Sequence, residues 1–322
     1  MDLLPPERLP LVPEPVLRAH KAYERNDSRF RSCARLLQSL WREKNDIPMG
    51  AFVTPAGRRH RQGNLLSGLP AHAGANFVCA EVHHLVRREL AYREPGAMVD
   101  VGRVYGNLLS SMPLAFNAFG LLKLDAGLAE RVVAALTPDM AGTICHIQFE
   151  HSPGRGDPAF TADGTAFDVF ISIRRADGAK VFLAVEVKYS ESMVEPEPRH
   201  RPRYDDLSLS CSLFRDPDDP ALRRNPLQQL WREHMLSQAI IDRGLYDDGR
   251  FVLLAPRLNN EVQRAATRYA GCLRKPLTGK AGFSNIVLED FIEAMKACGA
   301  PAPALALEER YTDFAPVHAL FS

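Results

Sequence analysis

The sequence lacks several features that would fix a function at once. No two cysteines are spaced as a redox or zinc pair, and no segment has the glycine-lysine pattern of a phosphate loop or the Gly-x-Ser-x-Gly of a serine hydrolase. The 322 residues include 40 Lys and Arg against 39 Asp and Glu, which excludes a globally basic nucleic-acid binder and an acidic disordered tail. We expect reduced cysteines that serve in packing, at Cys33, Cys79, Cys145, Cys211, Cys272 and Cys298.

Long hydrophobic runs are also missing. No stretch reaches the ~18 apolar residues of a membrane-crossing helix, and the first residues show no basic segment followed by an apolar one. We therefore expect a cytoplasmic protein without membrane association. With 46% hydrophobic and 25% charged residues, the composition is that of an ordinary globular protein.

The first part of the chain is predicted to be mainly helical. Apolar residues recur at helical spacing over 16–44, 76–90, 104–122 and 126–136, with a kink or break expected at Pro113. Between the first two segments, 46–74 is rich in glycine, proline and polar residues and is interpreted as a basic loop that contains Arg58, Arg59 and Arg61. We expect a mainly helical N-terminal region over 1–125.

After Pro138 the spacing of apolar residues changes from that of a helix to that of strands. Strands are predicted at 143–149, 165–174 and 181–189, followed by a proline-broken connection over 190–225. A helix at 226–243, a strand at 251–255 and a final helix, strand and helix at 259–273, 285–288 and 289–298 complete the order. Residues 126–322 should therefore form an α/β domain whose αβββαβ core carries a C-terminal α-β-α extension.

Ionisable residues stand inside the most apolar strands. Asp168 lies within the second strand, and Glu186 and Lys188 lie near the end of the third. Because side chains alternate along a strand, Glu186 and Lys188 project from one face. Buried charges are costly unless they are paired or bind a metal ion, so this group of three requires an explanation.

The turn between these two strands decides whether Asp168 joins them. A three-residue loop at Ala176, Asp177 and Gly178 would place Asp168 opposite Glu186, on the same face. A two-residue Asp-Gly turn would shift the register by one and place Asp168 on the other face. The sequence permits both, and a shared site requires the first.

Two carboxylates and a lysine in this arrangement suit phosphodiester hydrolysis. Carboxylate oxygens bind Mg²⁺ or Mn²⁺, and such a cation polarises a phosphate and activates water. The spacing of Asp168, Glu186 and Lys188, with the order of elements over about 126–256, resembles the PD-(D/E)XK nuclease superfamily, which has a restriction-endonuclease-like fold. The run 186–191 and Gln228 and Gln229 are similar to a diverged bacterial branch of it.

The resemblance implies roles for the matching residues. Asp168 and Glu186 would be the metal ligands and Lys188 the residue that orients water or stabilises the transition state, although Phe167 stands where the superfamily often has proline. A further acid is not identified uniquely: Glu150 at the end of the first strand is the preferred accessory residue, and Glu130 and Glu81 are alternatives.

The implied function is a Mg²⁺-dependent nuclease, acting on DNA rather than RNA, with a homodimer allowed for. The alternative is a catalytically silent protein of the same fold that binds nucleic acid or a protein partner. Asp168 and Glu186 could also be simple ion-pair partners of Lys188. Backbone phosphates would be contacted by arginine clusters, namely Arg58, Arg59, Arg61, Arg199, Arg201 and Arg203.

Overall fold

A five-stranded mixed sheet forms the centre of the computed structural model, which describes residues 8–54, 56–195, 197–275 and 279–321. Its strands lie in the order β3-β4-β5-β6-β7, with bounds Thr143–His151, Phe167–Arg174, Lys180–Val187, Asp248–Ala255 and Gly282–Val287. β3, β4 and β5 are antiparallel, whereas β5, β6 and β7 are parallel. The predicted α/β class with a mixed central sheet and an αβββαβ core is confirmed.

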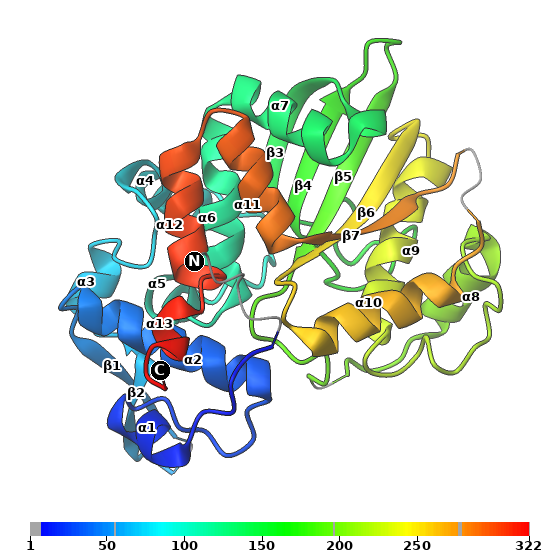
Figure 1. Ribbon diagram of the computed structural model, residues 1–322. Coiled ribbons are helices and arrows are strands. Elements are labelled where there is room, and N and C mark those ends of the chain that lie inside the picture. The colour runs from blue at the N-terminus through cyan, green and yellow to red at the C-terminus, as the bar shows by residue number, and fades with distance from the viewer. Residues whose placement is uncertain (1–7, 55, 196, 276–278, 322) are drawn as a thin grey trace.

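Helices cover both faces of this sheet (Figure 1). One face packs against α2 (Arg29–Lys44), α6 (Ser111–Leu124), α7 (Ala126–Leu136), α11 (Leu288–Ala297) and α12 (Pro301–Tyr311). The other packs against α8 (Pro202–Cys211), α9 (Gln228–Asp242) and α10 (Asn260–Cys272). The strand residues alternate accordingly: Ile171 and Leu183 face the first helices, and Phe170 and Phe182 face the second.

The remaining elements come mostly from the N-terminal part of the chain. They are α1 (Glu14–Ala19), β1 (Met49–Val53), β2 (Arg59–Leu66), α3 (Gly68–His72), α4 (Ala80–Ala91), α5 (Val101–Gly106), the 3-10 turn Pro138–Met140 and, at the C-terminal end, α13 (Ala315–His318). One hydrophobic cluster contains residues of α2 and α6 together with residues of the central strands. Helices α2 and α6 therefore share a core with the sheet, whereas residues of β2, α3, α4 and α5 form a separate cluster.

The basic loop expected over 46–74 is wrong. β1 and β2 form an antiparallel hairpin there, with Phe52 opposite His60 and Val53 opposite Arg59. The hairpin is held against α2, because Arg42 Nε donates to the Gly63 carbonyl at 2.8 Å and a Cβ at Gly63 would clash with Ser39. The outer half of the hairpin is exposed on both faces, so its residues are polar and show no apolar alternation. The strands were therefore not predicted from the sequence.

Two further expectations need correction. The break in the helical pattern falls at 107–110, before Pro113, which lies in the first turn of α6, where its missing N–H costs nothing. The proline-rich connection after β5 contains a regular helix, α8, in which Pro202 occupies the first turn. Pro226 precedes α9 rather than opening it, whereas Gly244 has φ +68° just after this helix, as the sequence predicts.

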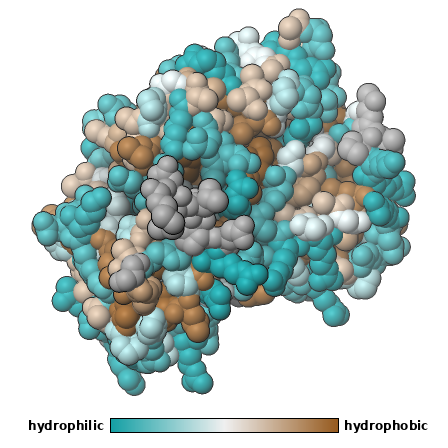
Figure 2. Space-filling view, viewed as in Figure 1, coloured by the Kyte–Doolittle hydropathy of each residue, from teal (hydrophilic) through white to brown (hydrophobic). Residues whose placement is uncertain are grey.

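Hydrophilic residues predominate on the face shown in Figure 2, and hydrophobic ones gather in a hollow over the sheet and around α1, α2 and α13. Apolar side chains of α6, α7 and the central strands line the hollow. No helix in the described part of the chain is long and apolar enough to cross a membrane.

Candidate active site

The β4–β5 hairpin has the register that brings Asp168 and Glu186 together. Val169 pairs with Val185 and Arg174 with Lys180, so Asp168 and Glu186 occupy opposing positions beyond the last pair. Arg175 N–H donates to the Ala179 carbonyl at 3.0 Å, and Gly178 has φ +87°. The loop is thus the three-residue turn that the shared-site interpretation required.

Glu150 extends this row onto a third strand. Phe149 pairs with Val169 and His151 with Phe167, so Glu150 lies opposite Asp168. Its φ of +50° is unusual for a residue with a side chain, and such strain is often found at functional sites. Three carboxyl groups on β3, β4 and β5 therefore stand side by side on the sheet face covered by α9.

Lys188 neutralises part of this acidic row. Its Nζ lies 2.7 Å from Glu186 Oε1, and the two residues are only 6% and 4% exposed. Asp168 Oδ2 accepts the Val187 N–H at 2.8 Å, which ties β4 to the end of β5. The three residues singled out from the sequence therefore lie together in the structure.

Helix α9 adds two polar residues to the cluster. Gln229 Nε2 donates to Glu186 Oε1 at 2.7 Å and to Glu233 Oε1 at 2.9 Å, and its Oε1 accepts from Lys188 Nζ at 2.8 Å. Glu233 is 3% exposed, and its Oε2 has no hydrogen-bond partner among the described residues. Sequence reasoning missed Glu233; its spacing of four from Gln229, on one helix face, was the available signal.

Crowded burial shifts the ionisation of the carboxyl groups. Burial, followed by the nearby Glu186 carboxylate, raises the pKa of Asp168 and of Glu233 well above the usual values, although Lys188 opposes both shifts. Burial also raises the pKa of Glu150, with Arg155 acting in the opposite direction. For Lys188, burial lowers the pKa, but Glu186, Glu191 and Glu233 outweigh it and raise the pKa overall.

The carboxyl groups of the cluster line a cleft of about 470 Å³ between the end of the sheet and the loops before α8 and α9, and Lys188 is not part of the lining. Its lining includes Glu150, Asp168, Glu186, Gln229 and Glu233. The position of the acids at the wall of an open cleft, rather than within a closed core, makes them accessible to a ligand.

Arginines reach the same cleft, but most of them have structural partners. Arg201 Nη1 donates to the Ala162 carbonyl at 2.5 Å, and Arg203 donates to the carbonyls of Phe160 and Ala159 at 2.9 and 3.1 Å. Arg199 is exposed and has no such partner among the described residues. Of the three arginines predicted to contact backbone phosphates, Arg201 and Arg203 also hold the 159–162 segment, and Arg199 has no such structural role among the described residues.

The alternative acids lie elsewhere. Glu130 Oε1 accepts the N–H of Ile144, near the opposite end of β3 from Glu150, and Glu81 is exposed on α4. Neither lines the cleft. Of the three candidates, only Glu150 lies beside Asp168.

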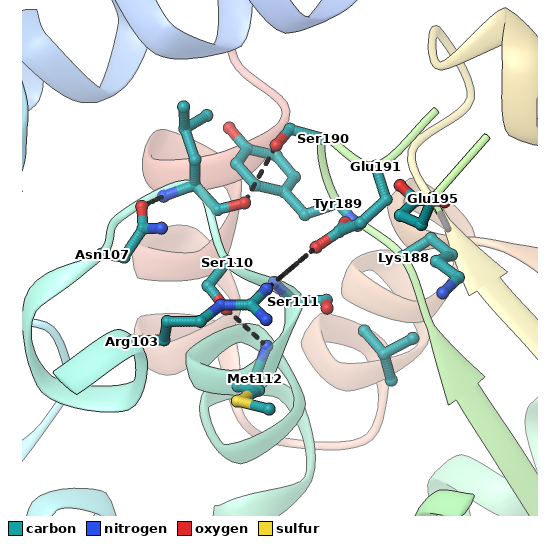
Figure 3. Close-up of polar contacts among 12 residues, drawn as sticks. Arg103, Asn107, Ser110, Ser111, Met112, Lys188, Tyr189, Ser190, Glu191 and Glu195 are labelled. Carbon is teal, nitrogen blue, oxygen red and sulfur yellow. Dashed lines mark hydrogen bonds and ion pairs between the residues drawn. The ribbon is translucent and has the colours of Figure 1, made fainter. Parts of the chain in front are cut away.

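The segment after Lys188 is hydrogen-bonded to the N-terminal part of the chain (Figure 3). Glu191 accepts the N–H groups of Tyr189 and Ser111 at 2.7 and 3.2 Å, which places its carboxylate at the N-terminus of α6. Ser190 Oγ donates to the Leu109 carbonyl at 3.0 Å, and Arg31 donates to the Ser190 carbonyl at 3.0 Å. Backbone immediately beyond Lys188 is thus fixed by the N-terminal region.

Residues of α2 and α12 hold the Tyr189 side chain. Gln38 Nε2 donates to the Tyr189 hydroxyl at 3.0 Å, and the Tyr311 ring meets the Tyr189 ring edge-on at 5.0 Å. Gln38 also accepts from Arg310, a buried guanidinium that lies 3.9 Å from the centre of the Trp41 ring. Helices α2 and α12 therefore both position the residue next to Lys188.

The donor chemistry of the cleft fits a hard divalent cation. Mg²⁺ and Mn²⁺ take oxygen ligands and can be held by one or two carboxylates plus water, and Asp168 and Glu186 supply two neighbouring carboxylates. Within the described ranges, no group of three or more His, Cys, Asp or Glu side chains is arranged so that it could hold a metal ion. A cation at Asp168 and Glu186 would also compete with Lys188 for Glu186 Oε1.

Acids on neighbouring strands thus lie at one end of the mixed sheet, with Lys188 just beyond β5. The family model described as the PD-(D/E)XK nuclease superfamily matches residues 25–313, so the chain belongs to that superfamily. No curated protein and no solved structure matches the chain. The match runs from α2 to α12 and thus includes both helices that hold Tyr189.

Proposed function

We propose that this protein is a metal-dependent nuclease that hydrolyses phosphodiester bonds in DNA. The observation that supports the proposal is the row of Glu150, Asp168 and Glu186 across three neighbouring strands at the wall of an open cleft, with Lys188 paired to Glu186. Membership of the nuclease superfamily supports the reaction class, and the finer assignments are ours.

Asp168 and Glu186 would hold Mg²⁺ or Mn²⁺, which when bound polarises the phosphate and makes water more acidic. Glu150 serves as an accessory acid: burial raises the pKa of its carboxyl group, so it holds a proton to higher pH than an exposed glutamate does. Lys188 stays charged beside Glu186 and can stabilise negative charge that develops on the phosphate.

Gln229 and Glu233 have supporting roles in this proposal. Gln229 contacts Lys188, Glu186 and Glu233 at once, so it fixes the relative positions of the lysine and a metal-binding carboxylate. Exposed Arg199 at the cleft contributes positive charge for a phosphate backbone.

The test is incubation of the purified protein with plasmid DNA, single-stranded DNA and RNA, each with Mg²⁺, Mn²⁺ or EDTA. Cleavage of DNA with either cation, and none with EDTA, is expected for the wild type. Asp168→Asn and Lys188→Ala should abolish it, whereas Asp177→Asn, at the exposed turn of the same hairpin, should cleave like wild type.

The same experiment addresses the alternative of a silent nucleic-acid or protein binder. Binding of labelled DNA without cleavage under every metal condition would refute the nuclease and favour that alternative. Cleavage that survives Asp168→Asn would refute the site while leaving the reaction class intact.

A further inference from the structure

A second cleft, of about 700 Å³, lies between the β1–β2 hairpin, the start of α2 and the segment 192–194. Clefts of this size hold small organic groups in many proteins. Its lining is polar, with three acids and two arginines, and Asp27 is paired with Arg31 at 3.1 Å and Arg35 at 2.7 Å. A cleft with slightly negative charge is unsuitable for phosphate and suits an uncharged group that forms hydrogen bonds.

Two asparagines supply an oriented hydrogen-bond donor in this cleft. Asn107 Oδ1 accepts the backbone N–H of Leu109 at 3.0 Å and the Asn64 amide at 3.1 Å. The backbone N–H can only donate, so the orientation of the Asn107 amide is fixed. Its Nδ2 is then left as a donor without a partner among the described residues, on a side chain that lines the cleft.

An aromatic ring stands at the same cleft. Phe52 is 40% exposed and lies stacked on its cross-strand neighbour His60, with ring centres 5.6 Å apart. Gln62, two residues beyond His60, lines the cleft as well, so this face of the hairpin points toward it. By alternation, Arg59 and Arg61 lie on the opposite face, where they are exposed. The hairpin therefore presents the Phe52 ring to the cleft and the charges of Arg59 and Arg61 to the other side.

A single segment of chain separates this cleft from the active-site cleft. Ser192 and Val194 line the second cleft, whereas Met193 and Glu195 line the first. Figure 3 shows Asn107 and Glu195 on opposite sides of the segment that carries Ser190 and Glu191. A strand that crosses this wall would have a phosphate at the acids and a base in the second cleft.

We propose that the second cleft binds an unpaired base of single-stranded nucleic acid, next to the phosphate at the active site. This inference rests on the proposed nuclease function. Phe52 stacks on the base, and the Asn107 amide donates to a carbonyl or ring nitrogen on its edge. A base in a duplex has its edge already paired and its faces stacked, so the cleft selects an unpaired strand.

The test measures fluorescence anisotropy of a short labelled DNA strand, and of its duplex, in EDTA to prevent cleavage. Phe52→Leu removes the ring but keeps an apolar side chain, and should weaken single-strand binding about 5- to 100-fold while changing duplex binding little. Phe52→Tyr should restore it. Leu69→Ala, which truncates a side chain 88% exposed on α3, is the matched control and should bind like wild type.

Asn107→Asp examines the donor separately, because it keeps the oxygen that Leu109 and Asn64 require. It should also weaken single-strand binding. Equal single-strand affinity in wild type and Phe52→Leu, or an equal loss for duplex, would overturn the inference, as would a wild type that binds no single strand. Cleavage of DNA with Mg²⁺ is scored independently, so a nuclease without this base site is distinguishable from a protein that is no nuclease.

Discussion

Gln229 provides the sharpest test of how the active site is held together. Its three hydrogen bonds, of 2.7, 2.8 and 2.9 Å, all join charged partners. A hydrogen bond to a charged group contributes about 1.5–3 kcal/mol, and three bonds from one side chain are not additive. Gln229→Leu, similar in volume and without polar atoms, should therefore lower the free energy of unfolding by about 3–5 kcal/mol.

The effect on turnover should exceed what the lost stability explains. Without Gln229, Lys188 and Glu186 keep their direct contact but lose the group that also ties them to Glu233 on α9. A misplacement of about 1 Å can cost roughly 100-fold in rate. We expect kcat on plasmid DNA to fall by about that factor at a temperature where the variant is folded, with a smaller change in KM.

Gln238, on the same helix, is a matched control. It is fully buried and also makes three hydrogen bonds, to Asp242, Gly279 and Ala281, outside the cleft. Gln238→Leu should lose about 2–3 kcal/mol of stability and retain kcat. Urea unfolding and a plasmid-cleavage time course measure both quantities. Equal kcat in the two variants would refute the positioning role of Gln229.

Three further predictions concern pH, metal and salt. Burial lowers the pKa of His234 to about 4. The free energy of unfolding should therefore fall by about 1.4 kcal/mol per pH unit as the pH drops from 6.5 toward 4. Urea unfolding measures this slope, and His234→Gln should lack it. Calorimetric titration with Mn²⁺ should show binding lost in Asp168→Ala and kept in Lys188→Ala; equal affinity in wild type and Asp168→Ala would contradict the ligand assignment. Arg199→Glu should reduce the slope of log affinity against log salt by about one, whereas Arg203→Glu should instead lower the melting temperature.

The sequence was sufficient for the centre of the fold because its signals there are local. Apolar alternation defines β4 and β5, and a glycine at position 178 allows the three-residue turn that places Asp168 opposite Glu186. The sequence alone left the register open between two turns. Only the pairing of strands decided it, because a shift of one residue changes which face Asp168 occupies.

Other parts could not be read from local pattern. Glu233 is far from Glu186 in sequence, and only the packing of α9 on the sheet brings them together. The β1–β2 hairpin is polar because its outer half is exposed, so it lacks the apolar alternation of a strand. Arg35 and Arg42 of α2 are charged, so the sequence alone does not indicate that the hairpin and its neighbours bury them.

The packing of α12 against Tyr189 has a consequence for biosynthesis. Strands β3 to β5 leave the ribosome well before α12, whose Tyr311 ring completes the packing around Tyr189. A nascent chain can therefore form the acidic row while the backbone that carries Lys188 still lacks its last support. We expect catalytic competence to appear only after α12 has been synthesised and has packed against Tyr189.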